Sequence, residues 1–558
     1  MSDSMKKQTF LHGTALLALA TAMVKVIGAL YKLPLNQIIG VQGFGYFNTA
    51  YQIYNVLLMV STAGLPVAMS RMISQASSVG DYGRMRRIYT VSRTIFLTLG
   101  VISAGLMFGF SGVLANALGQ PNAQPAIATL APASFLICLM STYRGFFQGQ
   151  RNMIPTSVSQ VLEAFVKLIV GIAAALLIKF YTDSIPLAAG GAIFGVTMSC
   201  LVSSFYLNRC YRKAMKDMPV VESTGSKKEI AKGLLAIAVP ITIGSAGLQL
   251  LTTLETGIYM DRLFNNVDTT MNAEALLQQL AIYGHDMTEV LTREESIQFV
   301  IDTQKGIYDM AITIFNMPCA FITPITVSVI PAITAQISTD DAEGAKRTEE
   351  SAARVTALIA MPCAVGLAVL AEPVTALLGG YSGEMLALAA QLMTVLGVCI
   401  MFNATVLLTN AIMQAHGRVN LPVINMFVGG FIKLAAIFIL TGNPHIGILG
   451  TPIGSLLCYL TITVLNIITV RRVLPNPPAI VRNMARGFLA AAIMGVITYG
   501  AWFGLKLIGI TSRVILCGAP IAVGGVVYLV AAIMLKAITR ADCELLPKGD
   551  KIAKLLHL

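Results

Sequence analysis

Residues 148–167 read QGQRNMIPTSVSQVLEAFVK, and residues 414–433 read QAHGRVNLPVINMFVGGFIK. The glutamine at 148 recurs at 414 and the lysine at 167 recurs at 433, so both recur at one offset, 266. Leu65-Pro66 is matched by Ile330-Pro331 at an offset of 265, and Leu118-Gly119 by Leu378-Gly379 at 260. About half of the chain is therefore predicted to be a copy of the other half. In membrane proteins such duplication is typical of transporters whose site lies between the copies.

The composition places this chain in a membrane. Apolar residues make up 56% of it and charged residues 12%, with a mean hydropathy of +0.74, far from the values of soluble domains. Nearly uncharged runs of about 20 residues, long enough to cross a bilayer as a helix, recur throughout. They are too long for barrel strands, and lipid demands internal hydrogen bonding, so the predicted fold class is an all-α polytopic membrane protein. About fourteen spans are expected, at 9–33, 44–72, 88–113, 124–148, 155–180, 186–208, 233–261, 303–336, 351–377, 386–414, 420–441, 446–470, 483–508 and 513–537.

The spans divide into two lobes of six and two extra helices. Because six is even, the second copy enters the membrane in the same direction as the first, so parallel lobes are expected. The predicted parts are an N-terminal lobe (1–210), a basic cytoplasmic linker (211–232), a C-terminal lobe (233–472) with an acidic outer loop (262–302), two extra helices (473–540) and a basic cytoplasmic tail (541–558). Leucines 276, 277 and 280 predict a short surface helix in the outer loop.

Lysine and arginine concentrate in alternate loops, which predicts orientation. The basic loops include Arg84, Arg86 and Arg87, the linker and Arg471-Arg472, and the positive-inside rule assigns them and both termini to the cytoplasm. The net charge of +12 is then a topology signal that attracts anionic lipid headgroups, and no nucleic-acid partner is expected. A plasma-membrane protein acting as a monomer is expected. The nine cysteines form no CxxC pair, so buried thiols are expected, without a metal or cofactor.

Charged residues inside spans are the main functional candidates, since an unpaired charge at mid-bilayer costs about 2.5 to 3.5 kcal/mol. Lys25 and Lys32 lie seven apart on one helix face, although Lys32 could equally extend to the outer headgroups. Asn48, Gln52 and Asn55 form a polar stripe in the second span. It either lines a water-filled cavity or joins neighbouring helices.

Further candidates lie in later spans. Glu255 is in span seven, and Asp309 is in span eight with Asn316 continuing its face. Glu163 and Lys167 are four apart, the spacing of a structural ion pair. Arg144 is at the predicted cytoplasmic end of span four, where it could contact an anion.

Several short motifs carry a family resemblance. They are Lys25-Val26-Ile27-Gly28 followed by Leu35 and Ile38-Ile39-Gly40, then Gly43-Phe44-Gly45-Tyr46, and Gly64-Leu65-Pro66 with Ser70-Arg71. In this order the motifs resemble the MOP flippase superfamily, in particular the polysaccharide exporters of the stage V sporulation protein B and YtgP type, which are related to the MurJ (MviN) lipid II flippases. The resemblance covers essentially the whole chain. It implies a MATE-like fold and inner-to-outer translocation of undecaprenyl-diphosphate-linked saccharides by alternating access.

The resemblance also implies roles for residues. MurJ-like proteins have an arginine where Lys25 stands, whereas a second cation of their first helix coincides with Tyr31, and Leu57, Leu58 and Met59 occupy the region of paired arginines. The hypothesis is that Lys25, Lys32 and Arg144 contact the diphosphate, because desolvated cations suit phosphate. Asn48, Gln52, Asn55 and Asn316 would then hydrogen-bond the sugar. Glu255 and Asp309 would bind a coupling ion, although Glu255 could equally form an ion pair. Na+, H+ or the membrane potential would supply the energy.

Two alternatives follow from other readings of the chain. A multidrug and toxin extrusion (MATE) antiporter of the same superfamily would be expected to offer buried acids to organic cations in its first lobe, where this chain offers lysine. A membrane glycosyltransferase would need acidic or histidine catalysts in the first outer loops, yet 34–45 and 116–124 contain none, and no GxxxxGK[ST] motif is present. The predicted class is therefore a transporter of a polyprenyl-diphosphate-linked glycan, not an enzyme.

Overall fold

The computed structural model describes residues 3–62, 64–150, 152–216, 219, 225–288 and 290–537. Side chains are described for most of these, but not for residues 3–22 or for Lys25. Within these ranges the chain is helical and contains no strand. The helices are α1 (Asp3–Thr62), α2 (Leu65–Ser78), α3 (Tyr82–Gly109), α4 (Ser111–Ala117), η1 (Pro121–Ala123), α5 (Gln124–Gly149), α6 (Ile154–Thr182), α7 (Ile185–Lys216), α8 (Lys227–Thr270), α9 (Ala273–Ile282), α10 (Arg293–Ser338), α11 (Ala342–Val369), α12 (Ala371–Leu378), α13 (Gly383–Ala415), α14 (Asn420–Thr441), η2 (Gly447–Leu449), α15 (Gly450–Val473), α16 (Ile480–Leu507) and α17 (Arg513–Met534).

The all-α membrane fold is confirmed. Among the described residues, eleven helices are long and apolar enough to cross a membrane, and each coincides with one of the predicted spans. The remaining three predicted spans fall on α1, α2 and α8, where some side chains are not described. The short helix predicted in the outer loop is α9, which buries Leu276 and Leu280 and leaves Leu277 exposed.

The first two predicted spans are joined by a turn at a single residue. Residues 34–43, predicted as a loop, are helical except at Gly40, whose φ of 74° and ψ of 174° lie outside the helical region. Tyr31 and Phe47 would lie about 24 Å apart along one straight helix, yet their ring centroids are 5.7 Å apart. The two halves of α1 therefore fold back on each other at Gly40, a conformation that glycine adopts without a Cβ penalty. Lys179 Nζ donates to the carbonyl of Ile38 at 2.6 Å and satisfies an acceptor beside the break.

Two predicted spans are each divided in the structure. The span predicted at 44–72 ends with α1 at Thr62, and α2 begins at Leu65 with Pro66 in its first turn, where a missing N–H costs nothing. Gly64 lies so close to the carbonyl of Ala238 that a side chain would not fit. The span predicted at 351–377 likewise consists of α11, ending at Val369, and the short α12. The predicted boundaries were wrong because hydropathy continues across both breaks.

The chain forms two compact units. The first unit comprises Met1–Asp261 with Gln298–Gly306, and the second comprises Arg262–Ile297 with Ile307–Leu558. This division by compactness cuts α8 and α10, whereas the predicted lobes follow the repeat. The lobe boundaries therefore stay a prediction.

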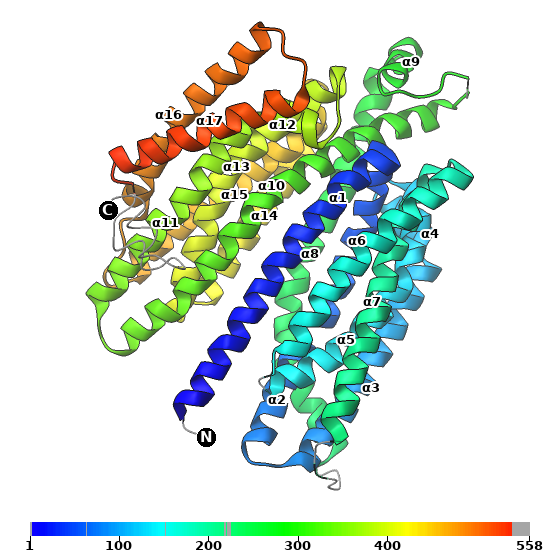
Figure 1. Ribbon diagram of the computed structural model, residues 1–558. Helices are drawn as coiled ribbons and strands as arrows, with labels where there is room; N and C mark the ends of the chain where they lie inside the picture. Colours follow the sequence, from blue (N-terminus) through cyan, green and yellow to red (C-terminus); the bar gives the residue numbers. More distant parts are fainter. Residues whose placement is uncertain are drawn as a thin grey trace. The chain divides into compact units, whose positions relative to one another are not determined.

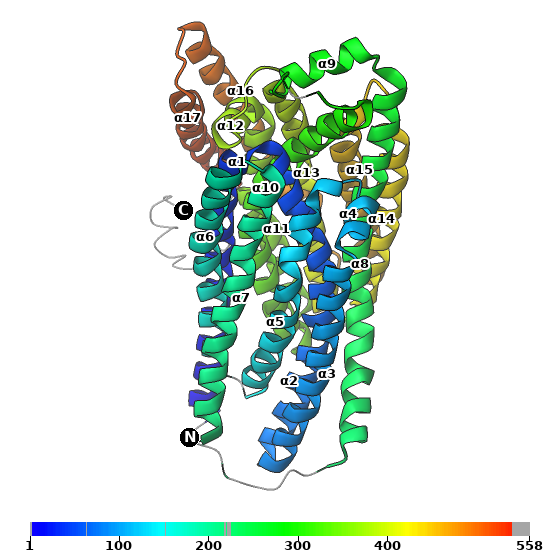
Figure 2. The ribbon, with the colours of Figure 1, turned by 90° about the vertical axis from the view of Figure 1, so that its right-hand side faces the viewer.

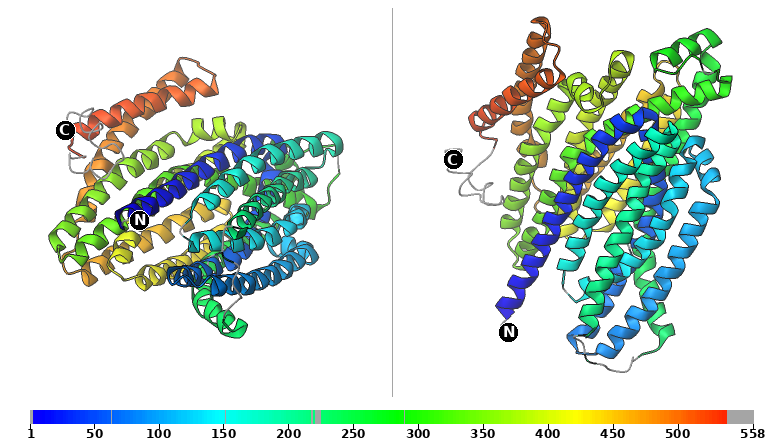
Figure 3. Two further views of the ribbon diagram at one scale, coloured as in Figure 1. Left: turned by 60° about the horizontal axis from the view of Figure 1, so that its bottom comes forward. Right: turned by 45° about the vertical axis from the view of Figure 1, so that its right-hand side comes forward.

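Each unit is a bundle of helices packed side by side. In the first unit α1 lies beside α6 and α7 (Figure 1), and α2, α3 and α5 pack side by side (Figure 2). In the second unit α14 packs on α15, and α11 packs on α13. The helices α16 and α17, drawn in orange and red, pair with each other along α11 and α12 (Figure 3). This hairpin exposes large apolar side chains such as Val496 and Val526, as a surface facing lipid does.

The repeat is visible in the backbone of the two units. Asp81 and Asp341 are related by the same offset as the two Leu-Gly pairs, 260, and each caps a helix by accepting a hydrogen bond from the third amide of its first turn. The residues before them, Gly80 and Asp340, both have positive φ angles, of 71° and 59°. The two copies thus share both the aspartate cap of this helix and the positive-φ residue that precedes it.

Candidate functional site

A lysine on α6 contacts both halves of α1. Lys167 Nζ lies 5.8 Å from the ring centroids of both Tyr31 and Tyr51, and 3.4 Å from the hydroxyl of Tyr51. Tyr31 is itself held by a 2.9 Å hydrogen bond to the carbonyl of Ala192 on α7. Aromatic faces stabilise a cation by their quadrupole, most strongly when water is excluded. The reversal at Gly40 therefore brings two tyrosines, one from each half of α1, to one cation.

The predicted Lys32 and Asn48 belong to the same region. Lys32 Nζ donates to Asn48 Oδ1 at 3.1 Å, and Asn48 Nδ2 donates to the carbonyl of Phe44 at 3.0 Å. Asn48 is buried and Lys32 half-buried. The two predicted positions are thus brought together, one from each half of α1. A second cation stands in the same helix group as Lys167.

Arg144 has a carboxylate partner. Its Nη2 lies 3.0 Å from Glu163 Oε2, and its Nε donates to Ser159 Oγ at 3.1 Å. The side chains of Arg144 and Glu163 are 19% and 27% exposed. The interpretation of Glu163 and Lys167 as the structural pair is corrected: the direct contact of Glu163 is with Arg144, on α5, and the contacts of Lys167 are aromatic. Spacing along one helix could not reveal this partner.

The polar stripe reaches α8. Gln52 Oε1 accepts a 2.9 Å hydrogen bond from Thr256 Oγ1. The neighbouring Glu255 is buried, at 6% exposed, and belongs with Lys32 and Lys167 to the first unit. Asn55, one turn beyond Gln52, is half-buried. Gln52 therefore joins two helices, while a role in sugar binding stays a prediction.

Three predicted residues either belong to the second unit or have a side chain that the structure does not describe. The side chain of Lys25 is outside the described side chains, although its backbone is part of α1. Asp309 and Asn316 are on the part of α10 that belongs to the second unit. Asp309 is 6% exposed and its carbonyl accepts from Thr313, whereas Asn316 is exposed. Their roles toward sugar or ion stay predictions.

A buried acid among the charges of span eight was not selected as a site residue. Asp302 on α10 is fully buried in the first unit and accepts three hydrogen bonds: from Tyr46 at 2.9 Å, Gln120 at 2.9 Å and Gln298 at 2.8 Å. Gly306, one turn on, lies against the carbonyl of Val41, where a Cβ would not fit. This network fixes residues 298–306 to the first unit. The signal available in the sequence was the place of Asp302 beside Lys305 and Asp309 among the charges of span eight.

The residues of this group suit an anion. The group contains the cations Lys32, Arg144 and Lys167 beside the acids Glu163 and Glu255. Among the described residues, no cluster of three histidine, cysteine or acidic side chains could hold a metal ion. Cations beside tyrosine hydroxyls and amides can bind a phosphate and the hydroxyls next to it.

Comparisons with known proteins identify the family and the fold. The family profile described as "Polysaccharide biosynthesis protein" matches residues 10–338, and a second profile of that description matches 298–382. Stage V sporulation protein B of Bacillus subtilis (strain 168) is 26% identical over 97% of this chain and 98% of its own length. Lipid II flippase MurJ of the same organism is 24% identical over 76% of each chain. A solved structure, lipid II flippase MurJ in an inward closed conformation, superposes with a TM-score of 0.63 at 12% identity, covering 94% of this chain and 98% of that one.

The fold and the matches define a multi-pass membrane protein of the MOP flippase type, as the resemblance implied. The chain belongs to the polysaccharide biosynthesis protein family, whose profile covers more than half of it. The relatives are named for sporulation and for lipid II flipping. The fold class and the family are thereby confirmed.

Proposed function

We propose that this protein translocates a polyprenyl-diphosphate-linked saccharide from the inner to the outer leaflet of the plasma membrane by alternating access. The family description and the name of the MurJ relative support a lipid-linked saccharide substrate. The positive-inside distribution of lysine and arginine supports cytoplasmic termini. The proposal needs a site that attracts a diphosphate in a region built of transmembrane helices.

The observation that carries the proposal is the aromatic setting of Lys167. Its charge lies between Tyr31 and Tyr51, while the carboxylate nearest in sequence, Glu163, contacts Arg144 instead. Lys32 supplies a second cation through its contact with Asn48. A diphosphate would exchange its water for these ammonium groups, whose point charges bind phosphate oxygens strongly in a desolvated site. Lys25 and Arg144 would contact the same anion from the periphery of the site.

The sugar and the energy source need separate groups. Asn48, Gln52, Asn55 and Asn316 would hydrogen-bond the saccharide. Glu255 and Asp309 are the acids that would bind a coupling cation, since both are buried. Moving one charge through 100 mV supplies about 2.3 kcal/mol, enough to reset a carrier between its two conformations. The proposal needs no cofactor.

The alternative function is a cation-coupled multidrug antiporter of the MATE type. Such a carrier of organic cations would be expected to present unmatched acids, whereas this site presents lysines beside tyrosines. Antibiotic susceptibility of a pump-deleted host expressing the chain separates the two functions. Increased resistance to cationic drugs, without effect on lipid-linked precursors, would favour the antiporter.

The decisive experiment is depletion of the protein with measurement of lipid-linked saccharide in each leaflet. We expect the precursor to accumulate in the inner leaflet and to return to normal on re-expression of the wild type. Complementation with Lys167→Gln at equal protein level should fail, and Lys167→Arg should restore part of the activity because it keeps the charge. An unchanged leaflet distribution of lipid II on depletion would assign another polyprenyl-linked glycan; no change in any such lipid would overturn the proposal.

A further inference from the structure

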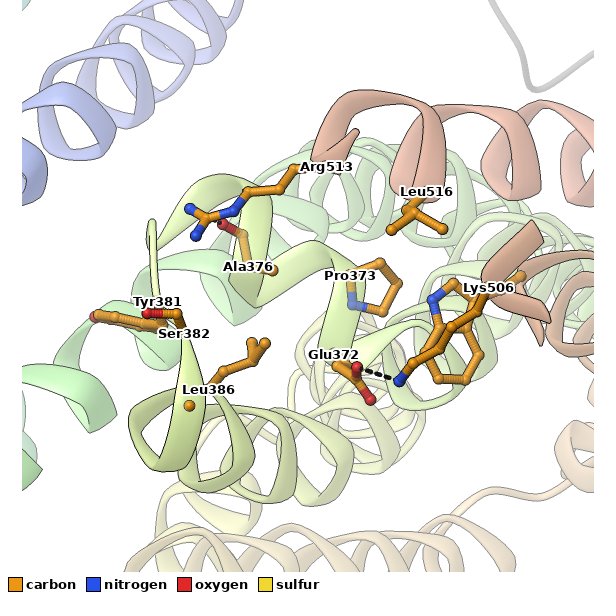
Figure 4. Close-up of a pocket in the computed structure, with 11 residues that line it drawn as sticks. Glu372, Pro373, Ala376, Tyr381, Ser382, Leu386, Lys506, Arg513 and Leu516 are labelled. Carbon is orange, nitrogen blue, oxygen red and sulfur yellow. Dashed lines mark hydrogen bonds and ion pairs between the residues drawn. The ribbon is translucent and has the colours of Figure 1, made fainter. Parts of the chain in front are cut away.

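A pocket of about 200 Å³ lies in the second unit, whereas the cationic site belongs to the first. It is formed where α12, the start of α13, the end of α16 and the start of α17 meet. Figure 4 shows Lys506 and Arg513 reaching it from opposite sides of Pro373. The function proposed above makes no use of this pocket.

The pocket carries a net positive charge. Lys506 Nζ contacts Glu372 Oε1 at 2.9 Å (Figure 4), so these two charges compensate. Within the described part of the chain Arg513 has no carboxylate partner; its Nη1 donates to the carbonyls of Gly380 at 3.1 Å and Ala376 at 3.4 Å. One side of the guanidinium is therefore anchored on the end of α12. The planar fork keeps further N–H groups that can bind phosphate oxygens.

Aromatic and apolar side chains surround the pocket as they do at a membrane interface. Trp502, the only tryptophan of the chain, lies with its ring centroid 5.0 Å from Lys506 Nζ and 5.4 Å from the Tyr499 ring. Leu507 and Ile508, at the turn after α16, are 73% and 78% exposed. Tryptophan and tyrosine beside lysine and arginine mark the headgroup level of a bilayer. These residue types are typical of the depth at which lipid phosphates are found.

We propose that this pocket binds the phosphodiester of an anionic phospholipid headgroup, with Arg513 and Lys506 as its ligands. Arg513 would pair with two phosphate oxygens while its other nitrogen stays on α12. Lys506 would share its ammonium group between Glu372 and the phosphate. The acyl chains would lie on the exposed apolar surface of α16 and α17. Bound in this way, the lipid would join the two-helix hairpin to α12.

The charge of the pocket predicts whether each substitution raises or lowers the affinity for lipid. The three charged groups sum to +1, which favours an anionic lipid over a zwitterionic one whose choline would be repelled. Replacing Glu372 by glutamine would release Lys506 and raise the local charge to +2. Lipid affinity should then increase, whereas replacing either cation should decrease it. A purely structural role of these residues would give no such opposite signs.

The test uses the full-length protein in detergent, with lipid occupancy read by native mass spectrometry. Phosphatidylglycerol, phosphatidylcholine and inorganic phosphate are titrated separately. We expect phosphatidylglycerol to bind wild type and to bind about tenfold more weakly to Arg513→Gln and to Lys506→Gln. Glu372→Gln should bind it several-fold more tightly. Arg482→Gln, an exposed cation at the other end of α16, is the matched control and should bind as wild type.

Three outcomes would overturn the proposal. Equal phosphatidylglycerol binding by Arg513→Gln, Lys506→Gln and the control would exclude these ligands. Equal binding of phosphatidylcholine would exclude selection by charge. Displacement of the lipid by millimolar inorganic phosphate would show a site for a free anion and not for a headgroup. Because occupancy is measured without transport, the result is independent of the flipping function.

Discussion

In the first copy of the repeat α6 and α7 meet at Gly171 and Gly195, whereas in the second copy α14 and α15 meet at Ile437 and Gly454. Ile437 follows Gly171 at the same offset as Lys433 follows Lys167, so these are matching places in the two helix pairs. A Cβ on Gly195 would meet the backbone of Gly171, while one on Gly454 would meet the side chain of Ile437. The first pair is thus packed backbone to backbone, and the second is filled by a side chain.

The charged positions differ in the same direction. In the first copy Glu163 pairs with Arg144. In the second copy Asn410 stands at the place of Arg144, and Gly429 stands at the place of Glu163 and lies against Ile462, so that position serves helix packing. Lys433 repeats the lysine but not the acid one turn before it. The helix arrangement has been duplicated, whereas the ion pair of Arg144 and Glu163 occurs in the first copy only.

The largest effect on stability is expected at the backbone contact of the first copy. Gly195→Ala should lower the free energy of unfolding by about 3 kcal/mol, because backbone cannot move aside as a side chain does. Gly454→Ala should cost about 1 kcal/mol, since Ile437 can change rotamer. Thermal unfolding of both variants in the same detergent measures the difference. Equal losses would mean that the two helix pairs are packed alike.

The functional asymmetry is tested with the two repeat lysines. Lys167→Gln should reduce translocation by about 10- to 50-fold, since a hydrogen bond to a charged group is worth about 1.5 to 3 kcal/mol and about 1.4 kcal/mol is a factor of ten. Lys433→Gln should reduce it less than threefold. Flipping of a lipid-linked saccharide in proteoliposomes, normalised to protein content, is the measurement. A larger loss in Lys433→Gln would place the anion site in the second copy.

The smallest effect is expected for the ion pair that only the first copy contains. Glu163→Gln and Arg144→Gln should each cost about 1 kcal/mol of stability, and the double variant should cost less than their sum by about 0.5 to 1 kcal/mol. Unfolding of the four proteins forms a double-mutant cycle. Additive losses would show that the two side chains do not interact, and Glu163 would again be a candidate partner of Lys167.

The helices could be predicted from sequence because each span carries its own apolar signal. The turns could not, because they depend on single residues: Gly40 reverses α1 by its backbone conformation, and Gly64 precedes α2 beside a carbonyl of α8. Neither event changes hydropathy. The sequence shows glycine at both places but not which glycine turns the chain.

The candidate site was predicted in part. Lys32 and Asn48 were both selected as polar residues in spans, and the structure joins them. The partner of Glu163 was mistaken because spacing along α6 reports only neighbours on that helix, while Arg144 comes from α5. Asp302 was not selected because its three donors come from α1, the segment before η1 and its own helix. Contacts between distant segments are the information that one sequence lacks.

The reversal at Gly40 leaves α1 no loop residues that could absorb an insertion or a deletion. Most connections between helices absorb inserted residues at the surface, but here helix continues on both sides of one glycine. One residue inserted between 41 and 50 would turn everything after it by about 100° around the helix axis relative to the turn. Tyr51 would leave Lys167, while Tyr31 would stay. We therefore expect natural variation in length to be excluded from this stretch and tolerated in the segment between α9 and α10.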